Sequence, residues 1–442
     1  MGLSTDYHDL LEVATMPINQ TIKSGYMEGT GGLNAVDWQE RISMSRMRSY
    51  RRSRAAQMLV DSGVDAALLL SAPNIRYVAG VATNSVSAAG GFHYTLLTAE
   101  GKVTHWDSPD HAVVQRRNCP WLDDVRYVVP GVGIAPAALG PGDASDVLLA
   151  AMADEIAGAL RDHGIASGKI AFDTTQNALG QRLEHLGFTV TMDAGALLGR
   201  ARAIKSHDEV ECLRMTAAIC DAGFQAMKEM IKPGARDNEI WAEAVRRIIS
   251  LGGEHGGGKL SSGPDTWPKS QSDLSDRIIR PGDVVYADIY NIAYNGYRSC
   301  YYRTFTCGKA KESTKDAYKR AVENLYDVLG QIRPGASTKE IAARFPDPRG
   351  EYWDYYDIRA PWQMTTNHWA HGIGLGHYEL PFIWRGISLQ HPMTIEEGMT
   401  MAVETQDRDE SQGVRVEEMV VVRSSGVEVL SLWPVGEITE VV

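Results

Sequence analysis

HGIGLGHYELP, the stretch from His371 to Pro381, places three glycines around two histidines. Glycine has no β-carbon, so the backbone of this stretch can come close to other atoms and adopt conformations that other residues avoid. A histidine on such a frame can point into a site and need not pack in a core. His371 is therefore the first candidate functional residue.

Three acidic residues, each within an apolar and strand-like run, accompany this histidine: Asp288, Glu404 and Glu417. A carboxylate in an apolar strand is costly unless it is paired or bound to a metal. One such residue is usually part of an ion pair, and ion pairs buried in a sheet are the alternative interpretation here. Divalent ions such as Mn²⁺ and Fe²⁺ take carboxylates with an added imidazole. The four residues together predict a metal or catalytic site.

Strand alternation distinguishes two neighbouring acids in the last of these runs. Adjacent residues of a strand point to opposite faces, so only one of Glu417 and Glu418 can point inward. Arg415 shares a face with Glu417 and could hold it in place. We therefore expect Glu417 to be the inward acid, with Arg415 beside it.

Composition limits the possible partners of the chain. Its 442 residues predict two or three domains of a globular protein, and the net charge of −12 argues against nucleic acid or an anionic membrane as the main partner. No apolar run approaches the roughly 20 residues of a membrane span, and no signal peptide is expected. The five cysteines are few, odd in number and without metal-knuckle spacing, which favours reduced thiols and a cytoplasmic location.

The chain is expected to have three parts. Residues 1–45 show no steady periodicity and predict an arm that lies over a neighbour or another subunit. Residues 46–195 alternate helix and strand patterns, which predicts an α/β domain, and residues 196–442 form a second domain whose first helix opens with a capping box at Ser206 and Glu209. Within the α/β domain we expect helices over 46–62, 144–163 and 177–186, strands over 66–70 and 170–172, and a hairpin over 94–106.

The second domain contains an internal sequence repeat. The segment Ile231–Ala235 recurs in similar form as Ile332–Ala336, and each copy is followed by a predicted helix. Asp288 and Glu404 each end an apolar strand pattern six residues after a glycine. This order predicts an internally duplicated domain in which the two acids face each other about a pseudo-twofold axis.

These motifs together resemble the pita-bread superfamily, which includes prolidase, aminopeptidase P, methionine aminopeptidase and creatinase. The resemblance spans about residues 46–442. It implies a creatinase-type α/β N-terminal domain, an α+β pita-bread catalytic domain with internal pseudo-twofold duplication, and a homodimer. The residues that carry the resemblance are Leu198–Lys205, Arg280–Val285, the His371 block ending in Glu379-Leu380-Pro381, and Val414–Glu418.

Three departures separate the chain from the two-metal peptidases of this family. The resemblance implies a second aspartate downstream of the first, but Cys300 stands in its place. It implies an upstream histidine where Lys269 or Ser270 occurs, and a second histidine where Tyr378 occurs, with His377 displaced by one. A two-metal clamp needs shared carboxylates. We therefore expect at most one divalent metal per chain (Fe, Mn or Zn), or none, as in creatinase.

The family members nearest in character are creatinase and the dimethylsulfoniopropionate lyase of this fold, which act on small cationic or zwitterionic substrates. Aromatic residues are frequent over residues 352–384. Ring faces bind such cations at roughly 0.5–2 kcal/mol each, although for any single ring packing is the favoured explanation. The candidate substrate-binding residues are Tyr356, Trp362, Trp369, His377, Tyr378 and Arg415.

The expectation is a cytoplasmic, homodimeric hydrolase or lyase that cleaves a C–N or C–S bond in a small cationic or zwitterionic substrate. One alternative is a Xaa-Pro dipeptidase or aminopeptidase with a degenerate metal site, and another is an inactive pita-bread module that binds a partner. The candidate catalytic residues are His371, Glu404 and Glu417, and the candidate metal ligands are Asp288, His371, Glu404 and Glu417, with Cys300 at the position of the second aspartate.

Overall fold

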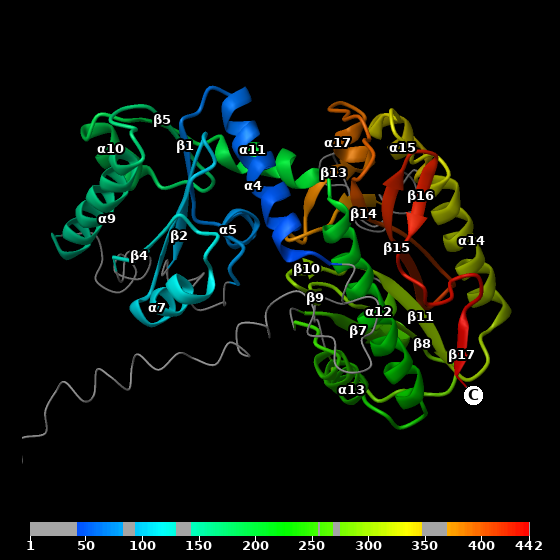
Figure 1. Ribbon diagram of the computed structural model, residues 1–442. Helices are drawn as coiled ribbons and strands as arrows, with labels where there is room; N and C mark the ends of the chain where they lie inside the picture. The colour runs from blue at the N-terminus through cyan, green and yellow to red at the C-terminus, as the bar shows by residue number, and fades with distance from the viewer. Residues whose placement is uncertain are drawn as a thin grey trace, which may run out of the picture.

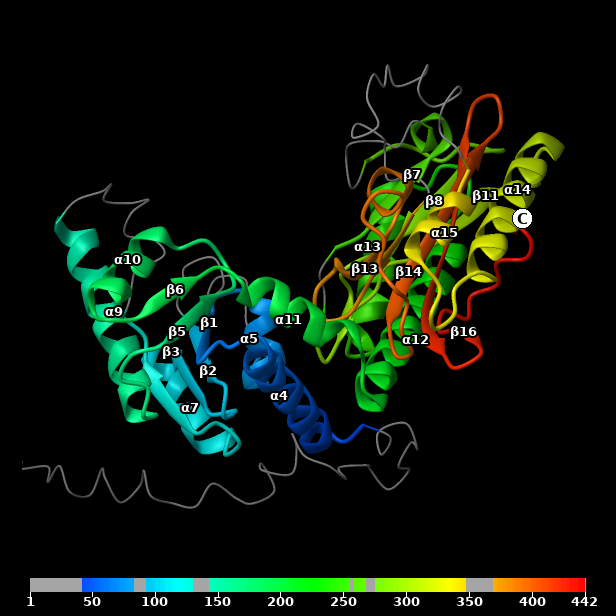
Figure 2. The ribbon, with the colours of Figure 1, turned by 90° about the horizontal axis from the view of Figure 1, so that it is seen from above.

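The protein folds into two lobes, with helices α4 (Met44–Asp61) and α11 (Ala194–Ala203) between them (Figures 1 and 2). The computed structural model describes residues 42–82, 93–129, 143–254, 257–267, 275–346 and 369–441. Nearly all of the predicted arm over 1–45 therefore lies outside the described residues. Among the helices that are described, none combines the length and the apolar character that crossing a membrane requires.

The N-terminal lobe is built on a six-stranded sheet in the order β4-β3-β2-β1-β5-β6. β2 pairs antiparallel with β1 and β3, while the other neighbours are parallel. Central β1 is an unbroken apolar run because it is buried throughout. The predicted hairpin is confirmed, and each predicted helix and strand occurs within two residues of its expected bounds. The strands are β1 (Ala66–Leu69), β2 (Tyr94–Thr98), β3 (Val103–Asp107), β4 (Asp124–Tyr127), β5 (Lys169–Phe172) and β6 (Thr189–Thr191), and the remaining helices are α5 (Ala72–Ala79), α7 (Pro109–Asn118), α9 (Asp143–Asp162) and α10 (Asn177–His185).

The C-terminal lobe contains two larger sheets, ordered β17-β11-β8-β7 and β13-β12-β14-β15-β16. They meet at β11 and β15, where the hydroxyl of Thr304 donates to the carbonyl oxygen of Arg415 at 2.6 Å. Helix α12 begins with the predicted capping box of Ser206 and Glu209. Helices α12 and α13 pack beside the first sheet, and α14 packs on β14 and β15 (Figure 1).

Each half of this lobe begins with two helices and continues with strands. The short pair β9 and β10 forms a hairpin of its own. The bounds are α12 (His207–Met230), α13 (Asp237–Ser250), β7 (Lys259–Ser262), a 3-10 turn (Gly263–Thr266), β8 (Val284–Asp288), β9 (Ala293–Tyr294), β10 (Tyr297–Arg298), β11 (Tyr302–Cys307), α14 (Glu312–Leu329), α15 (Thr338–Arg344), β12 (Trp369–Gly372), β13 (Glu379–Ile383), α17 (Arg385–Ser388), β14 (Thr400–Arg408), β15 (Gly413–Arg423), β16 (Gly426–Val429) and β17 (Thr439–Val441).

The two halves of this lobe repeat the same backbone hydrogen bonds. The amide of Gly234 donates to the carbonyl oxygen of Ile279, and the amide of Gly335 donates to that of Ile395. Both glycines have positive φ, +92° and +85°, a conformation that favours glycine. The sequence repeat therefore corresponds to a repeated turn. The two acids of the repeat lie in β8 and β14, which occupy equivalent places in the two halves.

Candidate active site

The buried acids and the histidine gather where the two sheets meet. Asp288 ends β8 and pairs with Tyr302 of β11. Glu404 of β14 pairs with Glu417 of β15, and His371 lies in β12, the other neighbour of β14. The four candidate ligands are almost completely buried, with Glu417 0 % and His371 1 % exposed. Tertiary structure thus brings together residues from both halves of the duplicated lobe.

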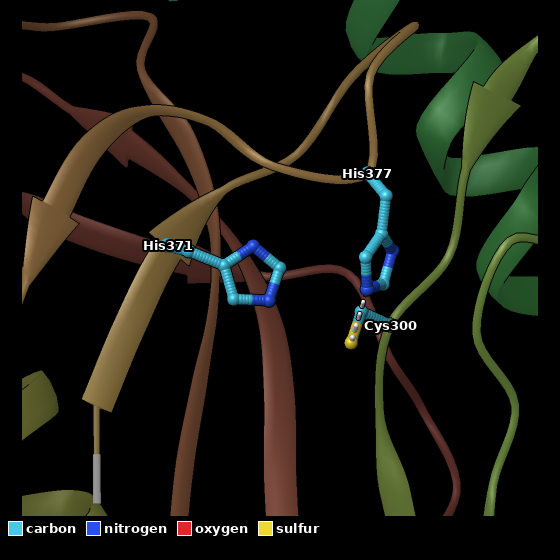
Figure 3. A group of neighbouring side chains, drawn as sticks. All are labelled: Cys300, His371 and His377. Atoms are coloured by element: carbon cyan, nitrogen blue, oxygen red, sulfur yellow. Dashed lines mark hydrogen bonds between the residues drawn. The ribbon is translucent and has the colours of Figure 1, made fainter. Parts of the chain in front are cut away.

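Cys300 lies among these groups, just before β11. Its thiol donates to Oε2 of Glu417 at 3.8 Å, and its Sγ lies 4.0 Å from Nε2 of His377 (Figure 3). Cys300 belongs to two groups of potential metal ligands. One group is Cys300 with Asp288 and Glu417, and the other is Cys300 with His371 and His377. Within each group the ligand atoms lie within 4.8 Å of one another. Burial raises the pKa of the Cys300 thiol well above its usual range, and the three neighbouring carboxylates raise it further.

The imidazole of His371 is held in one tautomer. Its Nδ1 lies 3.0 Å from the carbonyl oxygen of Gly372, which can only accept, so Nδ1 carries the proton and Nε2 keeps a lone pair. Burial lowers the pKa of His371 to about 4, and the backbone carbonyls of Gly372 and His377 offset only part of this effect. The ring is therefore neutral near pH 7, as a metal ligand or a general base must be.

Close contacts explain two of the glycines in this stretch. A β-carbon on Gly372 would lie 2.2 Å from the carbonyl oxygen of Leu380, and one on Gly374 would lie 2.5 Å from Oε2 of Glu379. The strand pairing is also irregular between His371 and Gly372. A larger residue at either glycine would displace the backbone that positions His371.

Glu418 lies on the opposite face of β15 from Glu417, in the arrangement that strand alternation predicts. Arg303 donates to its carboxylate at 2.8 Å, and the hydroxyl of Ser431 donates to the same oxygen. Arg303 and Glu418 are both buried, at 1 % and 2 % exposure. Glu418 therefore belongs to a structural ion pair, and Glu417 is the acid beside the thiol.

Trp369 and Arg415 both lie near the buried acids. The ring of Trp369 is centred 4.7 Å from that of His371, and its indole N–H donates to Oε1 of Glu404. The guanidinium of Arg415 lies 5.4 Å from the centre of the Tyr302 ring. Trp369 thus orients a carboxylate, and Arg415 places its positive charge over an aromatic wall of the site.

Tyr378 marks the side of the site that faces solvent. Its ring is centred 4.8 Å from that of His371 and 4.4 Å from that of His377, yet the residue is 56 % exposed. Burial raises the pKa of Tyr378 to about 12, with further contributions from Cys300 and the three carboxylates. The negative field of the buried acids therefore reaches a side chain in contact with water.

A buried ion-pair network that sequence reasoning missed fixes the loop after His371. Glu379 accepts from Lys205 at 2.8 Å, from Arg202 at 2.9 Å and from the amide of Gly376 at 2.8 Å. Burial would raise the pKa of Glu379, but Lys205 and Arg202 together lower it to about 2. The available signal was a pair of basic residues, with Arg202 in the last turn of α11 and Lys205 just after that helix.

Four residues discussed above from the sequence lie outside the described residues: Tyr356, Trp362, Lys269 and Ser270. A contribution of the first two to a cation site stays a prediction. The same holds for the substitution of the upstream histidine.

The donor atoms suit one divalent ion better than a pair of hard ions. Thiolate and imidazole favour Zn²⁺ or Fe²⁺, whereas a shared carboxylate is what a two-metal centre requires. Three buried carboxylates within the same region also favour a cation, because like charges that are buried close together repel one another. When bound, such an ion would act as a Lewis acid toward a carboxylate or carbonyl oxygen.

Two family models match consecutive parts of the chain: the creatinase/prolidase N-terminal domain over residues 51–204 and metallopeptidase family M24 over residues 211–424. The dimethylsulfoniopropionate lyase DddP of Roseobacter denitrificans is 24% identical over 88% of this chain and 87% of its own length. That of Roseovarius nubinhibens is 25% identical over 92% and 89%. The probable dipeptidase PepE of Mycobacterium tuberculosis is 26% identical over 52% of this chain and 59% of its own.

Solved structures share the fold. The Xaa-Pro dipeptidase from Bacillus anthracis has a TM-score of 0.67 and 21% identity, covering 89% of this chain and 99% of that chain. The X-Pro aminopeptidase from Thermotoga maritima has a TM-score of 0.66 and 20% identity, covering 88% and 99%. At these identities the similarity concerns architecture.

Proposed function

The chain belongs to the pita-bread superfamily, and we propose that within it the protein cleaves a C–S or C–N bond in a small zwitterion that carries a fixed positive charge and a carboxylate. It is a hydrolase or lyase of this superfamily. A cytoplasmic homodimer, as the sequence predicts, is part of the proposal.

One observation carries the choice of substrate charge. Asp288, Glu404 and Glu417 are buried together, and beside them half-exposed Tyr378 stands against both imidazoles. A cationic group that entered past this ring would meet an aromatic face and a negative field, both of which stabilise it. A peptide without a free α-ammonium would gain neither interaction, whereas the ammonium of a dipeptide would gain both. The choice between a small zwitterion and a dipeptide therefore rests on the residue at the second aspartate position.

The identity of the residue at the second aspartate position favours a small-molecule reaction over peptide hydrolysis. Cys300 stands there, beside Glu417, and a thiol does not supply the shared carboxylate of a two-metal peptidase centre. The relatives also support this choice, because the two lyases match about nine-tenths of the chain and the dipeptidase about half.

A lyase reaction needs a base beside the substrate's acidic carbon. The base removes a proton next to the carboxylate, the C–H electron pair forms a C=C bond, and the C–S pair leaves with the cationic sulfur. Glu404 is the candidate base, because the indole of Trp369 holds its carboxylate in one orientation. Glu417 is the strand partner of Glu404, and His371 lies on the strand at the other side of β14, so both belong to the same proposed site.

A substrate panel tests the proposal with the purified full-length protein. Dimethylsulfoniopropionate and creatine represent cationic C–S and C–N substrates, and Ala-Pro represents the peptidase alternative. Product formation is followed by NMR after loading with Zn²⁺, Fe²⁺ or Mn²⁺ in turn. We expect turnover of dimethylsulfoniopropionate or creatine and little or none of Ala-Pro. Faster cleavage of Ala-Pro would contradict the proposal, and inactivity on the whole panel would favour a binding module.

A further inference from the structure

We infer that Cys300, His371 and His377 form a binding site for one zinc-like divalent ion, with the sulfur of Cys300 as a direct ligand. The inference rests on the proposed function in one respect only: it assigns the ion and the proposed substrate to the same site. No local sequence motif predicts it, because 71 residues separate Cys300 from His371.

The spacing of the donor atoms fits one tetrahedral ion. Zinc binds sulfur at about 2.3 Å and imidazole nitrogen at about 2.0–2.1 Å, which places the two donors about 3.6 Å apart in a tetrahedron. Sγ of Cys300 and Nε2 of His377 lie 4.0 Å apart, and the donor atom of His371 completes a group within 4.8 Å. Only a small side-chain adjustment separates this arrangement from that around a bound ion.

The hydrogen bonding of His371 independently points to a ligand. A metal-binding histidine almost always donates its other ring N–H to a carbonyl or carboxylate, which fixes the tautomer. His371 does this with the carbonyl oxygen of Gly372, so that Nε2 is the nitrogen available to an ion. Figure 3 shows the rings of His371 and His377 beside each other, near the sulfur of Cys300.

The elements that carry the three ligands are held rigidly. His371 lies in β12, inside the five-stranded sheet, and the loop that carries His377 is fixed through the buried carboxylate of Glu379 and the amide of Gly376. Cys300 lies two residues before the start of β11, an inner strand of the four-stranded sheet. Ligands preset on rigid elements lower the ordering cost of binding.

The ligand types determine which ion the site prefers. One thiolate and two imidazoles select a borderline ion such as Zn²⁺ over Mn²⁺, which prefers oxygen ligands. Three protein ligands leave a fourth position open, as in catalytic zinc sites. Asp288 and Glu417 form the second group around Cys300 and add negative charge that favours a dication.

Cobalt and zinc are the probes for this inference. Metal-free full-length protein is titrated with Co²⁺ and followed by absorption spectroscopy, because bonding between thiolate and cobalt gives a charge-transfer band that oxygen and nitrogen ligands do not. X-ray absorption of the zinc-loaded protein then counts sulfur and imidazole neighbours. We expect one ion with one sulfur and two imidazole nitrogens. A spectrum with no sulfur neighbour would overturn the inference.

Variants identify the ligands. Cys300→Ser should abolish the charge-transfer band, and His377→Leu should remove one nitrogen and weaken Zn²⁺ binding at least about a hundredfold, since loss of an outer partner alone costs 10–100-fold. Cys307→Ser and His391→Gln, which alter another buried cysteine and an exposed histidine, are the matched controls and should keep both signals.

The outcomes separate this inference from the proposed function. Unchanged zinc affinity in folded His377→Leu protein would assign the ion to Asp288 and Glu417 and overturn the ligand set. If Cys300→Ser fails to fold, Cys300→Asp replaces it, because aspartate keeps a ligand but removes the sulfur. Sulfur–metal bonding without turnover of any cationic substrate would uphold this inference and reject the substrate proposal.

Discussion

The ammonium of Lys205 lies 2.8 Å from Oε2 of Glu379, and this buried ion pair joins the connection that follows α11, between the two lobes, to the loop that carries His377. Arg202 contacts the other carboxylate oxygen at 2.9 Å. The same carboxylate accepts from the amide of Gly376. The connection between the two lobes therefore helps to position the active-site loop, although it supplies none of the candidate ligands.

Replacing Lys205 with methionine should destabilise the protein by up to about 3 kcal/mol. Breaking a buried ion pair costs about 3–5 kcal/mol, and the remaining contact with Arg202 reduces that loss. Denaturant unfolding measures the change. Lys319→Met, which removes an exposed pair with Glu323 at 3.9 Å, is the control and should change stability by less than about 1 kcal/mol. Equal effects of the two substitutions would show that the Lys205 pair contributes no more to the free energy of unfolding than an exposed pair does.

The depressed pKa of Glu379 predicts a pH dependence of stability. Its pKa is about 2 in the folded state against an ordinary value of 4.5. Because the folded pKa is the lower one, the stabilisation is complete above about pH 4.5 and is lost as the pH falls toward about 2, amounting to roughly 3 kcal/mol in all.

Glu379→Gln should therefore flatten the acid side of the stability profile. Unfolding free energies of wild type and variant are compared from about pH 6 to about pH 3. Glu410→Gln, a change at an exposed glutamate, should retain the wild-type slope. An unaltered slope in the Glu379 variant would mean that other carboxyl groups govern acid stability.

Trp369→Phe separates the hydrogen bond of the indole from its aromatic face. The variant keeps a ring beside His371 but loses the donor to Glu404. A hydrogen bond to a charged group contributes about 1.5–3 kcal/mol, so kcat should fall at least about tenfold while KM changes little. Steady-state kinetics on the best substrate of the panel provide the measurement. Trp384→Phe, at a tryptophan whose ring is centred 6.0 Å from that of Trp369, is the matched control and should keep the wild-type kcat. A wild-type kcat for Trp369→Phe would remove Trp369 from the positioning of Glu404.

Substrate charge is tested at Tyr378. A neutral isostere should bind more weakly than the cationic substrate by about 1–3 kcal/mol, the sum of one or two cation–π contacts. Tyr378→Leu should weaken binding of the cation and leave that of the isostere nearly unchanged, as measured by calorimetry. Similar losses for both compounds would indicate that Tyr378 only packs against His371 and His377.

Much of the fold was predictable because its signals are local. Alternating helix and strand patterns located the N-terminal sheet, and the capping box located the start of α12. The repeated turn could be predicted because it needs glycine at a positive φ, which leaves a mark in the sequence at Gly234 and Gly335. Strand alternation likewise predicted the opposite directions of Glu417 and Glu418.

The rest of the site depends on contacts between distant residues. Lys205 and Glu379 are 174 residues apart, so no periodicity links them. The approach of Cys300 to His377 similarly requires both sheets to be in place. Trp369 was predicted as a ring for a cation, but its indole N–H contact with Glu404 depends on the register of β12 against β14.

The central claim is that this site binds one metal ion, whereas a two-metal peptidase binds two. Elemental analysis of the purified full-length protein, which counts metal ions per chain, tests it most directly. We expect about one zinc or iron ion per chain, because Cys300 does not bridge two hard cations as a carboxylate does. Cys300→Asp, which restores the carboxylate, should take up a second ion when Mn²⁺ is supplied. Two manganese or cobalt ions per chain in the wild-type protein would contradict the account.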